Sequence, residues 1–273
     1  MPPPREYRID LEHAEALRWR EVIATETATA RQLFAEAGAE FAVVPEGMRK
    51  LFSGLYRLFG GLYRKEIRAW AEATGQSVGT VTLLNCAYEL SHFPPKLFGC
   101  TAGAAWVEGL GMLHARALDW PLKAMGCSTR LFRFHRAGRE FVVVGVPGMV
   151  GVLSGMVPGA YSVTINWAPP VGIPSFHFGP CFHLRRVLET CDTYDAAVEK
   201  LRRTHLSTSV FFTVCGTARG QACVIERSAR SAVVRTLVEP AIAQANHHSL
   251  NGRFAKNRRP ACEGRQRVPP VCA

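Results

Sequence analysis

The sequence predicts an α+β fold in which sheets pack face to face with helices outside them. The first hundred residues are rich in Ala, Glu, Arg and Leu and have few helix breakers. After Pro94-Pro95 the chain changes to short β-prone runs separated by Gly, Pro or Asn. Two helix-like segments then interrupt the strands before strands resume. Runs of strands, then helices, then strands again are typical of a sandwich.

The N-terminal third is expected to form three helices. Residues 12–38 have helix-favouring composition throughout. Residues 47–73 repeat apolar side chains at spacings of three to five, which is the pattern of an amphipathic helix. Gly60-Gly61 should break or kink that helix. A third helix is expected over residues 77–90.

The remainder is expected to form nine strands and two helices. Ala137-Gly138 has the composition of a turn between two strands. Helices are expected near 181–190 and 192–203, the second opened by Asp192 as its N-cap. The strands are expected near 100–107, 112–118, 130–136, 140–146, 150–156 and 160–166, and again near 208–216, 221–227 and 231–238.

Length and composition exclude several classes of protein. A chain of 273 residues with 48% hydrophobic residues is neither disordered nor collagen-like. A chain of this size can bury roughly three quarters of its unfolded surface. The formal net charge is +11, and six basic residues against Glu263 place +5 in the last 21 residues, from Arg253 onward. Nucleic-acid binding is one interpretation of that charge. A solvated basic tail is favoured, and no nucleic-acid partner is expected.

The chain is expected to be soluble and cytoplasmic. Its first residues lack the apolar region of a signal peptide. Residues 141–184 contain no charged side chain, but their seven Gly and six Pro indicate buried strands and turns rather than a membrane helix. Nine cysteines show no C-x-x-C pair, and their odd number argues against a secreted disulfide framework.

No metal or cofactor is expected. Phosphate-loop, H-E-x-x-H, G-x-S-x-G and EF-hand motifs are all missing from the sequence. His247-His248 could bind a metal, but adjacent side chains at a strand end point in opposite directions. A surface or core role is the better interpretation of this pair.

One set of polar residues remains as a candidate site. Cys100 opens the β-rich half, and Arg116 and Asp119 follow in the segment His-Ala-Arg-Ala-Leu-Asp-Trp. Asn166 and Asn246 lie further along the chain. Alone, each is weak, because a cysteine before a strand is usually a small buried hydrophobe and an Arg and Asp three apart usually form a surface pair.

The order and spacing of these residues resemble a known family. Cys100 is followed by Arg116 after 16 positions and by Asp119 after three more, and Arg258 lies in a later Asn-Arg-Arg-Pro-Ala segment. This arrangement resembles the family of N-acylethanolamine-hydrolysing acid amidase and acid ceramidase, which are cysteine N-terminal-nucleophile hydrolases. Bile salt hydrolases and isopenicillin N acyltransferase are more distant relatives. The likeness also takes in residues 2–22, 66–68 and 84–89.

The resemblance implies a fold and a maturation step. The fold is a four-layer αββα sandwich of the N-terminal-nucleophile type, preceded by an N-terminal helical segment. The chain would cut itself between Gly99 and Cys100. Residues 1–99 would then be the helical, α-subunit-like fragment and residues 100–273 the catalytic, β-subunit-like fragment. The two fragments are expected to stay associated.

The resemblance also implies a mechanism. The freed α-amine of Cys100, with an ordinary pKa of about 7.7–8, would act as general base without a histidine. The thiolate would attack the substrate amide to form a thioester, which water then hydrolyses. Arg116 would lower the pKa of the thiol, and Asp119 would orient the new ammonium group.

The remaining site assignments come from the same likeness. Asn246 and Asn166 would donate to the oxyanion, and Arg258 would brace the site. The chain departs from the family at His247, where the relatives have Tyr, and in a longer segment between Tyr88 and Cys100. It also ends soon after the Arg-Arg-Pro-Ala segment, so the last strands of the sheet are expected to be absent.

The implied activity is hydrolysis of a linear amide in an N-acylated lipid such as an N-acylethanolamine or a ceramide. Peripheral contact with lipid is compatible with such a substrate. Two alternatives remain open: acyl transfer on the same scaffold, and a truncated, non-catalytic binding relative. An apolar wall for the acyl chain is expected from Met149, Val150, Leu153, Met156, Trp167 and Phe176.

Overall fold

The computed structural model describes residues 3–40, 61–90, 99–120, 122–172, 175–238 and 240–249, together with positions 42, 47 and 54. No helix in these ranges is both long enough and apolar enough to cross a membrane. The helical elements are η1 (Glu15–Leu17), α1 (Arg20–Glu40), η3 (Gly61–Tyr63), α3 (Arg64–Thr74), α4 (Val78–Asn85), α5 (Ala87–Leu90), α6 (Pro180–Thr190) and α7 (Tyr194–Arg203). The strands are β1 (Glu6–Asp10), β2 (Gly99–Val107), β3 (Gly111–Asp119), β4 (Arg130–Arg136), β5 (Arg139–Gly145), β6 (Ser154–Val157), β7 (Tyr161–Trp167), β8 (Val210–Gly216), β9 (Ala222–Arg227), β10 (Ala232–Thr236) and β11 (Ala241–Gln244).

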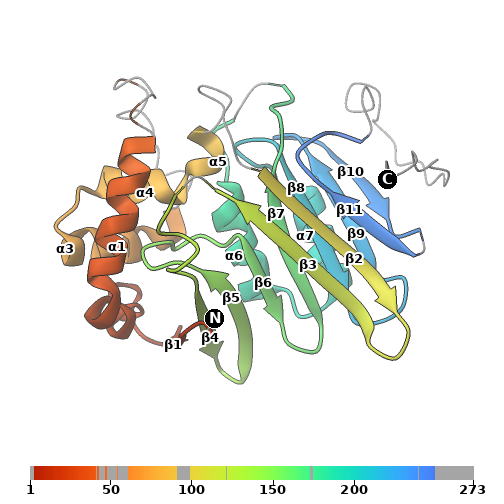
Figure 1. The fold of residues 1–273 in the computed structure, drawn as a ribbon, viewed down its shortest axis with the longest axis horizontal. Coiled ribbons are helices and arrows are strands. Elements are labelled where there is room, and N and C mark those ends of the chain that lie inside the picture. The colour runs from red at the N-terminus through yellow and green to blue at the C-terminus, as the bar shows by residue number, and fades with distance from the viewer. Residues whose placement is uncertain are drawn as a thin grey trace.

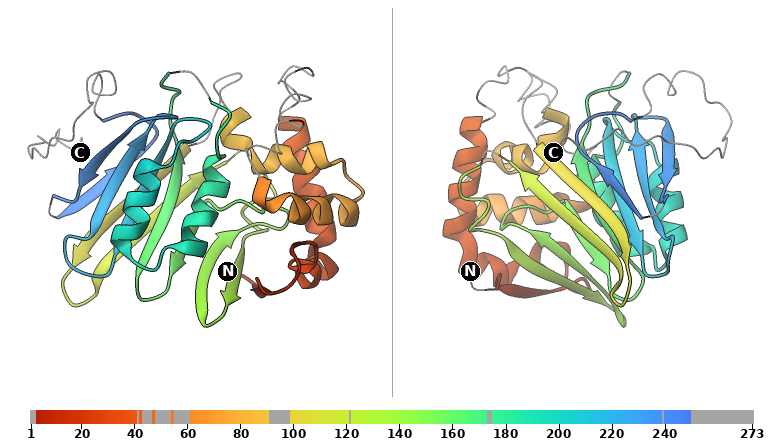
Figure 2. Two further views of the ribbon diagram at one scale, coloured as in Figure 1. Left: turned by 180° about the vertical axis from the view of Figure 1, so that it is seen from behind. Right: turned by 45° about the vertical axis from the view of Figure 1, so that its right-hand side comes forward.

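The strands form two sheets that face each other (Figure 1). The larger sheet has eight strands in the order β1-β4-β5-β6-β7-β8-β9-β10, and the smaller has three in the order β11-β2-β3. All pairings are antiparallel except that of β1 with β4. Strand β2 crosses over β7 and β8, and α6 and α7 cover the opposite face of the large sheet (Figure 2).

The N-terminal segment packs onto the same helical side of the large sheet. Trp19, just after η1, packs edge-on against Phe132 and Phe134 of β4. Arg185 of α6 lies over the Phe134 ring and donates to both carboxylate oxygens of Glu66 on α3, at 2.6 and 2.9 Å. Both members of this ion pair are fully buried, so α3 and α6 are locked together inside the core.

The predicted α+β sandwich of two facing sheets is confirmed. The outward residues of β3, Leu113, Ala115 and Ala117, are exposed. Within the described part of the chain, the helical cover therefore lies on the large sheet rather than on the outer face of the small one.

Most predicted strands and helices after residue 99 are found within about three residues of their expected ends. Strand β6 begins only at Ser154, because Val150 and Gly151 instead give their N–H groups to the Asn85 side chain, at 2.7 and 3.0 Å. Helix α7 is capped by Thr193 rather than Asp192, since the Thr193 hydroxyl accepts from Ala196 N–H.

Two strands were not predicted, and one predicted helix can be compared only in its last part. Strand β1 lies in a short Glu-Tyr-Arg-Ile-Asp segment, and β11 has only four residues. Residues 48–53 and 55–60 of the helix expected over residues 47–73 lie outside the described residues. Its last part coincides with α3.

Candidate active site

The pairing of β2 with β3 brings Cys100 and Arg116 together. Cys100 pairs with Leu118 in the antiparallel register, so Arg116 lies diagonally across on the same inward face. Arg116 Nη2 is 3.7 Å from the Cys100 Sγ. The cysteine side chain is buried. The guanidinium of Arg116 therefore lies beside the thiol.

Arg116 is held by the large sheet as well. Its Nη2 donates to the Ile165 carbonyl at 3.0 Å, and its Nη1 donates to the Ser154 hydroxyl at 3.2 Å. The buried Nε has no hydrogen-bond acceptor among the described residues. The guanidinium is therefore fixed between the two sheets, with one donor left over beside the thiol.

Asp119 lies beside the peptide bond that would be cut. It pairs directly with Gly99 in the register of β2 and β3. A Cβ atom on Gly99 would come within 3.0 Å of the Asp119 Oδ2, so glycine allows the carboxylate to approach the backbone there. Strand alternation places Asp119 and Arg116 on opposite faces of β3. They therefore do not form the mutual surface pair that was the alternative interpretation.

The two candidate asparagines, Asn166 and Asn246, also lie at this end of β2, but they contact different partners. Asn246, which follows β11, accepts the backbone N–H of Cys100 on its Oδ1 at 2.7 Å and donates to the Trp167 carbonyl at 2.7 Å. Asn166 of β7 is buried and donates to the Gln244 carbonyl at 2.9 Å. Asn246 thus contacts Cys100 directly, whereas Asn166 holds the end of β11 that precedes Asn246.

Arg258 lies outside the described residues, as does Arg259. The structure thus brings together Cys100, Arg116, Asp119, Asn166 and Asn246, and it does not place the sixth candidate.

Two residues near the nucleophile were not singled out from the sequence. Tyr88 donates its hydroxyl to the Ile165 carbonyl at 3.1 Å and interacts electrostatically with Cys100 and Arg116. Tyr88 lies in segment 84–89, which resembles the acid amidase family, so the sequence contained an indication of its importance. Ser154, the partner of Arg116, lies in a Leu-Ser-Gly segment that has no recognisable motif.

A buried carboxylate follows Tyr88 in the same segment. Glu89 accepts a hydrogen bond from the Ser207 hydroxyl at 3.1 Å. Its burial raises the pKa of the carboxyl group to about 7. This group therefore titrates near neutrality within the element that also carries Tyr88.

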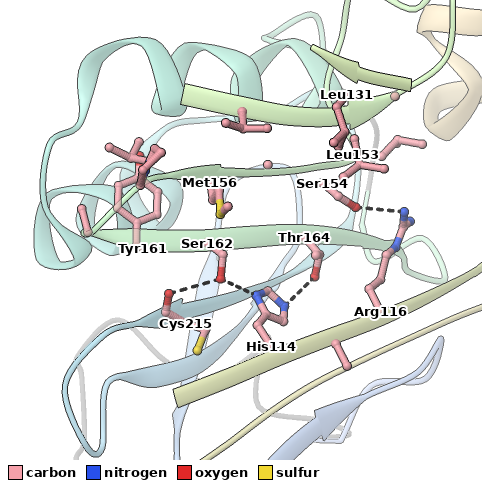
Figure 3. A pocket seen from close by; sticks show the side chains of 18 of the residues that line it. His114, Arg116, Leu131, Leu153, Ser154, Met156, Tyr161, Ser162, Thr164 and Cys215 are labelled. Carbon is pink, nitrogen blue, oxygen red and sulfur yellow. Dashed lines mark hydrogen bonds between the residues drawn. The ribbon is translucent and has the colours of Figure 1, made fainter. Parts of the chain in front are cut away.

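An apolar groove of about 870 Å³ begins at Arg116 and runs along β3 over the large sheet (Figure 3). Three of the six expected wall residues, Met149, Leu153 and Met156, line it. Phe176 instead lines a separate shallow pocket and is 67% exposed. Val150 and Trp167 do not line the groove. A long apolar chain attached at Cys100 would meet this wall.

The segment that carries Asn246 is held by an ion pair. His248 Nε2 donates to the Pro169 carbonyl at 3.0 Å, and its Nδ1 lies 3.4 Å from Glu226 Oε2. Glu226 is fully buried and also pairs with Arg235 at 2.9 Å. Since both ring nitrogens face acceptors, the arrangement fits a protonated imidazole. No cluster of three or more potential metal-binding His, Cys, Asp or Glu side chains occurs in the described ranges.

The fold and this site define the class of protein: an N-terminal-nucleophile hydrolase fold with a cysteine at the start of a central strand. No family model matches the chain. It is 27% identical to the N-acylethanolamine-hydrolyzing acid amidase of Caenorhabditis elegans over 84% of this chain and 69% of that protein. It is 26% identical to the acid ceramidase of Rattus norvegicus over 83% of this chain and 64% of that protein.

A solved structure is similar to this chain as well. The Caenorhabditis elegans N-acylethanolamine-hydrolyzing acid amidase ortholog matches with a TM-score of 0.50 at 27% identity, over 58% of this chain and 74% of that one. The resemblance to the acid amidase and acid ceramidase family is confirmed by these comparisons. The chain spans about two thirds of the length of the curated relatives.

Proposed function

We propose that this chain is a cysteine amidohydrolase that hydrolyses the linear amide bond of N-acylated lipids through Cys100. Its relatives are named as N-acylethanolamine and ceramide amidases, which supports amide hydrolysis. The single observation that carries the proposal is the surroundings of Cys100. Its backbone nitrogen contacts Asn246, its thiol faces Arg116, and Asp119 lies against Gly99.

The first step of the proposal is self-cleavage. Transfer of the Gly99 acyl group to the Cys100 sulfur, followed by attack of water, would release a carboxylate on Gly99 and an amine on Cys100. That amine would remain within reach of Asn246, because the contact already exists through the backbone nitrogen. Asp119 would then lie on the side vacated by the Gly99 chain and would stabilise the ammonium form.

The second step is substrate hydrolysis. The α-amine takes the thiol proton, the sulfur attacks the amide carbon, and the protonated amine is the donor to the departing amine. Water then cleaves the thioester to give the fatty acid and restore the thiol. The part-buried Arg116 would supply positive charge near the developing oxyanion, and the Asn246 amide would supply a donor.

The apolar groove supports a lipid as the acyl part. It begins at Arg116 and is lined largely by Met, Leu, Val and small residues. A groove of about 870 Å³ is large enough for a drug-sized or fatty chain.

The division at residue 99 is also proposed, with fragments 1–99 and 100–273 held together after the cut. Strand β1 pairs with β4 across this division, and Glu66 of the first fragment pairs with Arg185 of the second in the core. Both contacts would survive the loss of one peptide bond.

N-terminal sequencing of the purified protein, combined with a hydrolysis assay, tests the proposal. We expect a second N-terminus at Cys100 and release of fatty acid from a saturated long-chain N-acylethanolamine. A folded, uncleaved chain that releases no fatty acid at either pH 5 or pH 7 would favour the non-catalytic alternative. Formation of a new amide when an amine is added would favour acyl transfer.

A further inference from the structure

A polar cluster interrupts the apolar groove next to the proposed nucleophile. It consists of His114 on β3 with Ser162 and Thr164 on β7, and is here called the subsite cluster (Figure 3). His114 Nδ1 lies 2.8 Å from the Ser162 hydroxyl, and Nε2 lies 3.2 Å from the Thr164 hydroxyl. The cluster therefore links the two sheets and forms part of the groove wall.

The hydrogen positions in the subsite cluster follow from its partners. Burial, together with the positive charge of Arg116, lowers the pKa of His114 to about 4, so the ring is neutral and has one N–H. Ser162 donates its only hydroxyl hydrogen to the Cys215 carbonyl, 3.4 Å away. With Ser162 as donor to Cys215, we assign His114 Nδ1–H as the donor to Ser162 and Nε2 as the acceptor from the Thr164 hydroxyl.

This assignment leaves the subsite cluster able to accept but not to donate. Every polar hydrogen of the three side chains is used, while the oxygens of Ser162 and Thr164 keep unused lone pairs. A bound hydroxyl group would complete them. A ketone oxygen would face lone pairs, and a methylene would leave the acceptors unpaired. Arg116 and Arg133 also line the groove, so a cationic donor is disfavoured.

The position of the cluster relates it to the acyl chain. His114 precedes Arg116 by two residues on the same face of β3, a separation of about 6.6 Å along the strand. Arg116 in turn contacts the Cys100 thiol. Met156 pairs with Ser162 across β6 and β7, so an acyl chain that leaves Cys100 along β3 passes the subsite cluster and Met156 at the same level of the groove.

We propose that the subsite cluster recognises a hydroxyl group on the acyl chain of the substrate, so that amides hydroxylated at one mid-chain position are preferred. This inference rests on the proposed function. The cluster acts in binding and not in proton transfer, because a neutral ring with so low a pKa is a weak base.

A panel of N-acylethanolamines of one chain length tests the inference. The panel includes the unsubstituted chain, single hydroxyl groups at successive carbons, and single ketones at the same carbons. We expect kcat/KM to rise about three- to tenfold at one or two adjacent hydroxyl positions, as for one net hydrogen bond. The matching ketones should fall to the level of the unsubstituted chain or below it.

Two variants separate recognition from sheet packing. In Thr164→Val and in Ser162→Ala, the hydroxylated and the unsubstituted amides should have equal kcat/KM values. Thr129→Val is the matched control, because Thr129 lines another wall of the same groove and donates to the Met125 carbonyl. It should keep the wild-type ratio.

The outcomes distinguish this inference from the proposed function. Hydrolysis of the unsubstituted amide with no hydroxyl preference, or a preference that survives in Thr164→Val, overturns the subsite and leaves the proposed function intact. If no amide is hydrolysed, calorimetric binding of the same panel to Cys100→Ala decides. Tighter binding of one hydroxylated chain supports the subsite, and equal binding of all chains overturns it.

Discussion

The backbone N–H of Cys100 donates to the side-chain oxygen of Asn246 at 2.7 Å, although 146 positions separate the two residues. The same asparagine donates its amide to the Trp167 carbonyl. Asn246 therefore holds the backbone nitrogen of Cys100, the proposed nucleophile, in the uncut chain, and the large sheet orients its side-chain amide.

Replacing Asn246 is the first test of this contact. We expect Asn246→Ala to slow both self-cleavage and amide hydrolysis, the latter by about 10²–10³-fold, as for the loss of one oxyanion donor. His247→Ala is the control, because His247 is the exposed neighbour. Band patterns on a denaturing gel report cleavage, and fatty-acid release reports hydrolysis. Equal rates in the two variants would remove Asn246 from the mechanism.

Asp119→Asn tests the role of the carboxylate beside Gly99. The variant keeps the shape but removes the charge that would stabilise the ammonium of Cys100. Activity should fall by orders of magnitude while the circular dichroism spectrum is unchanged. Asp195→Asn, an exposed carboxylate in the first turn of α7, should retain full turnover. Near-normal turnover in Asp119→Asn would show that the carboxylate is an ordinary surface group with no role in the reaction.

Processing and fragment association can be measured together. The wild type should give fragments 1–99 and 100–273 on a denaturing gel but one peak in gel filtration. Cys100→Ala should give a single full-length band. Processing that continues without the thiol would overturn the assignment of Cys100.

The buried pair of Glu66 and Arg185 predicts how the fragments hold together. Glu66→Gln removes the buried charge that faces Arg185 and Arg18 and leaves Arg185 paired with Glu189. Breaking a buried ion pair typically costs about 3–5 kcal/mol of unfolding free energy, and the remaining Glu189 pair should keep the loss at the lower end. The midpoint of urea unfolding should therefore move to a clearly lower urea concentration. Glu140→Gln is the control, because it breaks the part-exposed pair with Arg133. A similar small shift in both variants would show that the core pair does not bind the fragments.

The order of strands and helices after residue 99 was predictable because most strands either alternate apolar and polar side chains or form short apolar runs, and because Gly, Pro or Asn separates many of them. Strand β11 was missed because its four residues, Ala-Ile-Ala-Gln, are too short for a pattern. Strand β1 was missed because only Ile9 is buried in it, and its pairing with β4 spans more than 120 positions.

The site was predictable only where spacing along one hairpin fixed it. Cys100, Arg116 and Asp119 lie on paired strands, so their separation in sequence determines their register. Ser154 joins Arg116 from another sheet, and no local pattern encodes that contact. His114 precedes Arg116 by two positions, so strand alternation predicts that both side chains lie on the same face of the strand.

The His248–Glu226 pair predicts a pH dependence of stability. Burial lowers the pKa of His248, but the hydrogen bonds with Glu226 and the Pro169 carbonyl outweigh it and raise the pKa above its usual value. A raised pKa in the folded state means that the pair stabilises the protein fully below about pH 6.5, the unfolded value. That stability should be lost as the pH rises through the higher, folded pKa.

Urea unfolding at a series of pH values measures this effect. His248→Gln should flatten the decline in stability above about pH 6.5, whereas His247→Gln should leave it unchanged. A wild-type decline that persists in His248→Gln would place the titrating group elsewhere.

The apolar groove predicts that acyl-chain length controls the rate. Each additional buried methylene contributes about 0.8 kcal/mol, or roughly fourfold in kcat/KM, until the groove is filled. Saturated long-chain N-acylethanolamines should therefore be cleaved far faster than short-chain ones, and bile-salt conjugates and penicillins should be poor substrates. Leu153→Ala removes apolar side-chain surface from the groove wall near Arg116, so it should weaken the dependence of kcat/KM on acyl-chain length. A panel of amides that differ only in acyl length measures it. A flat or inverted profile would reject the lipid substrate while leaving the assignment of Cys100 standing, because that assignment rests on the contacts of the thiol and its backbone nitrogen.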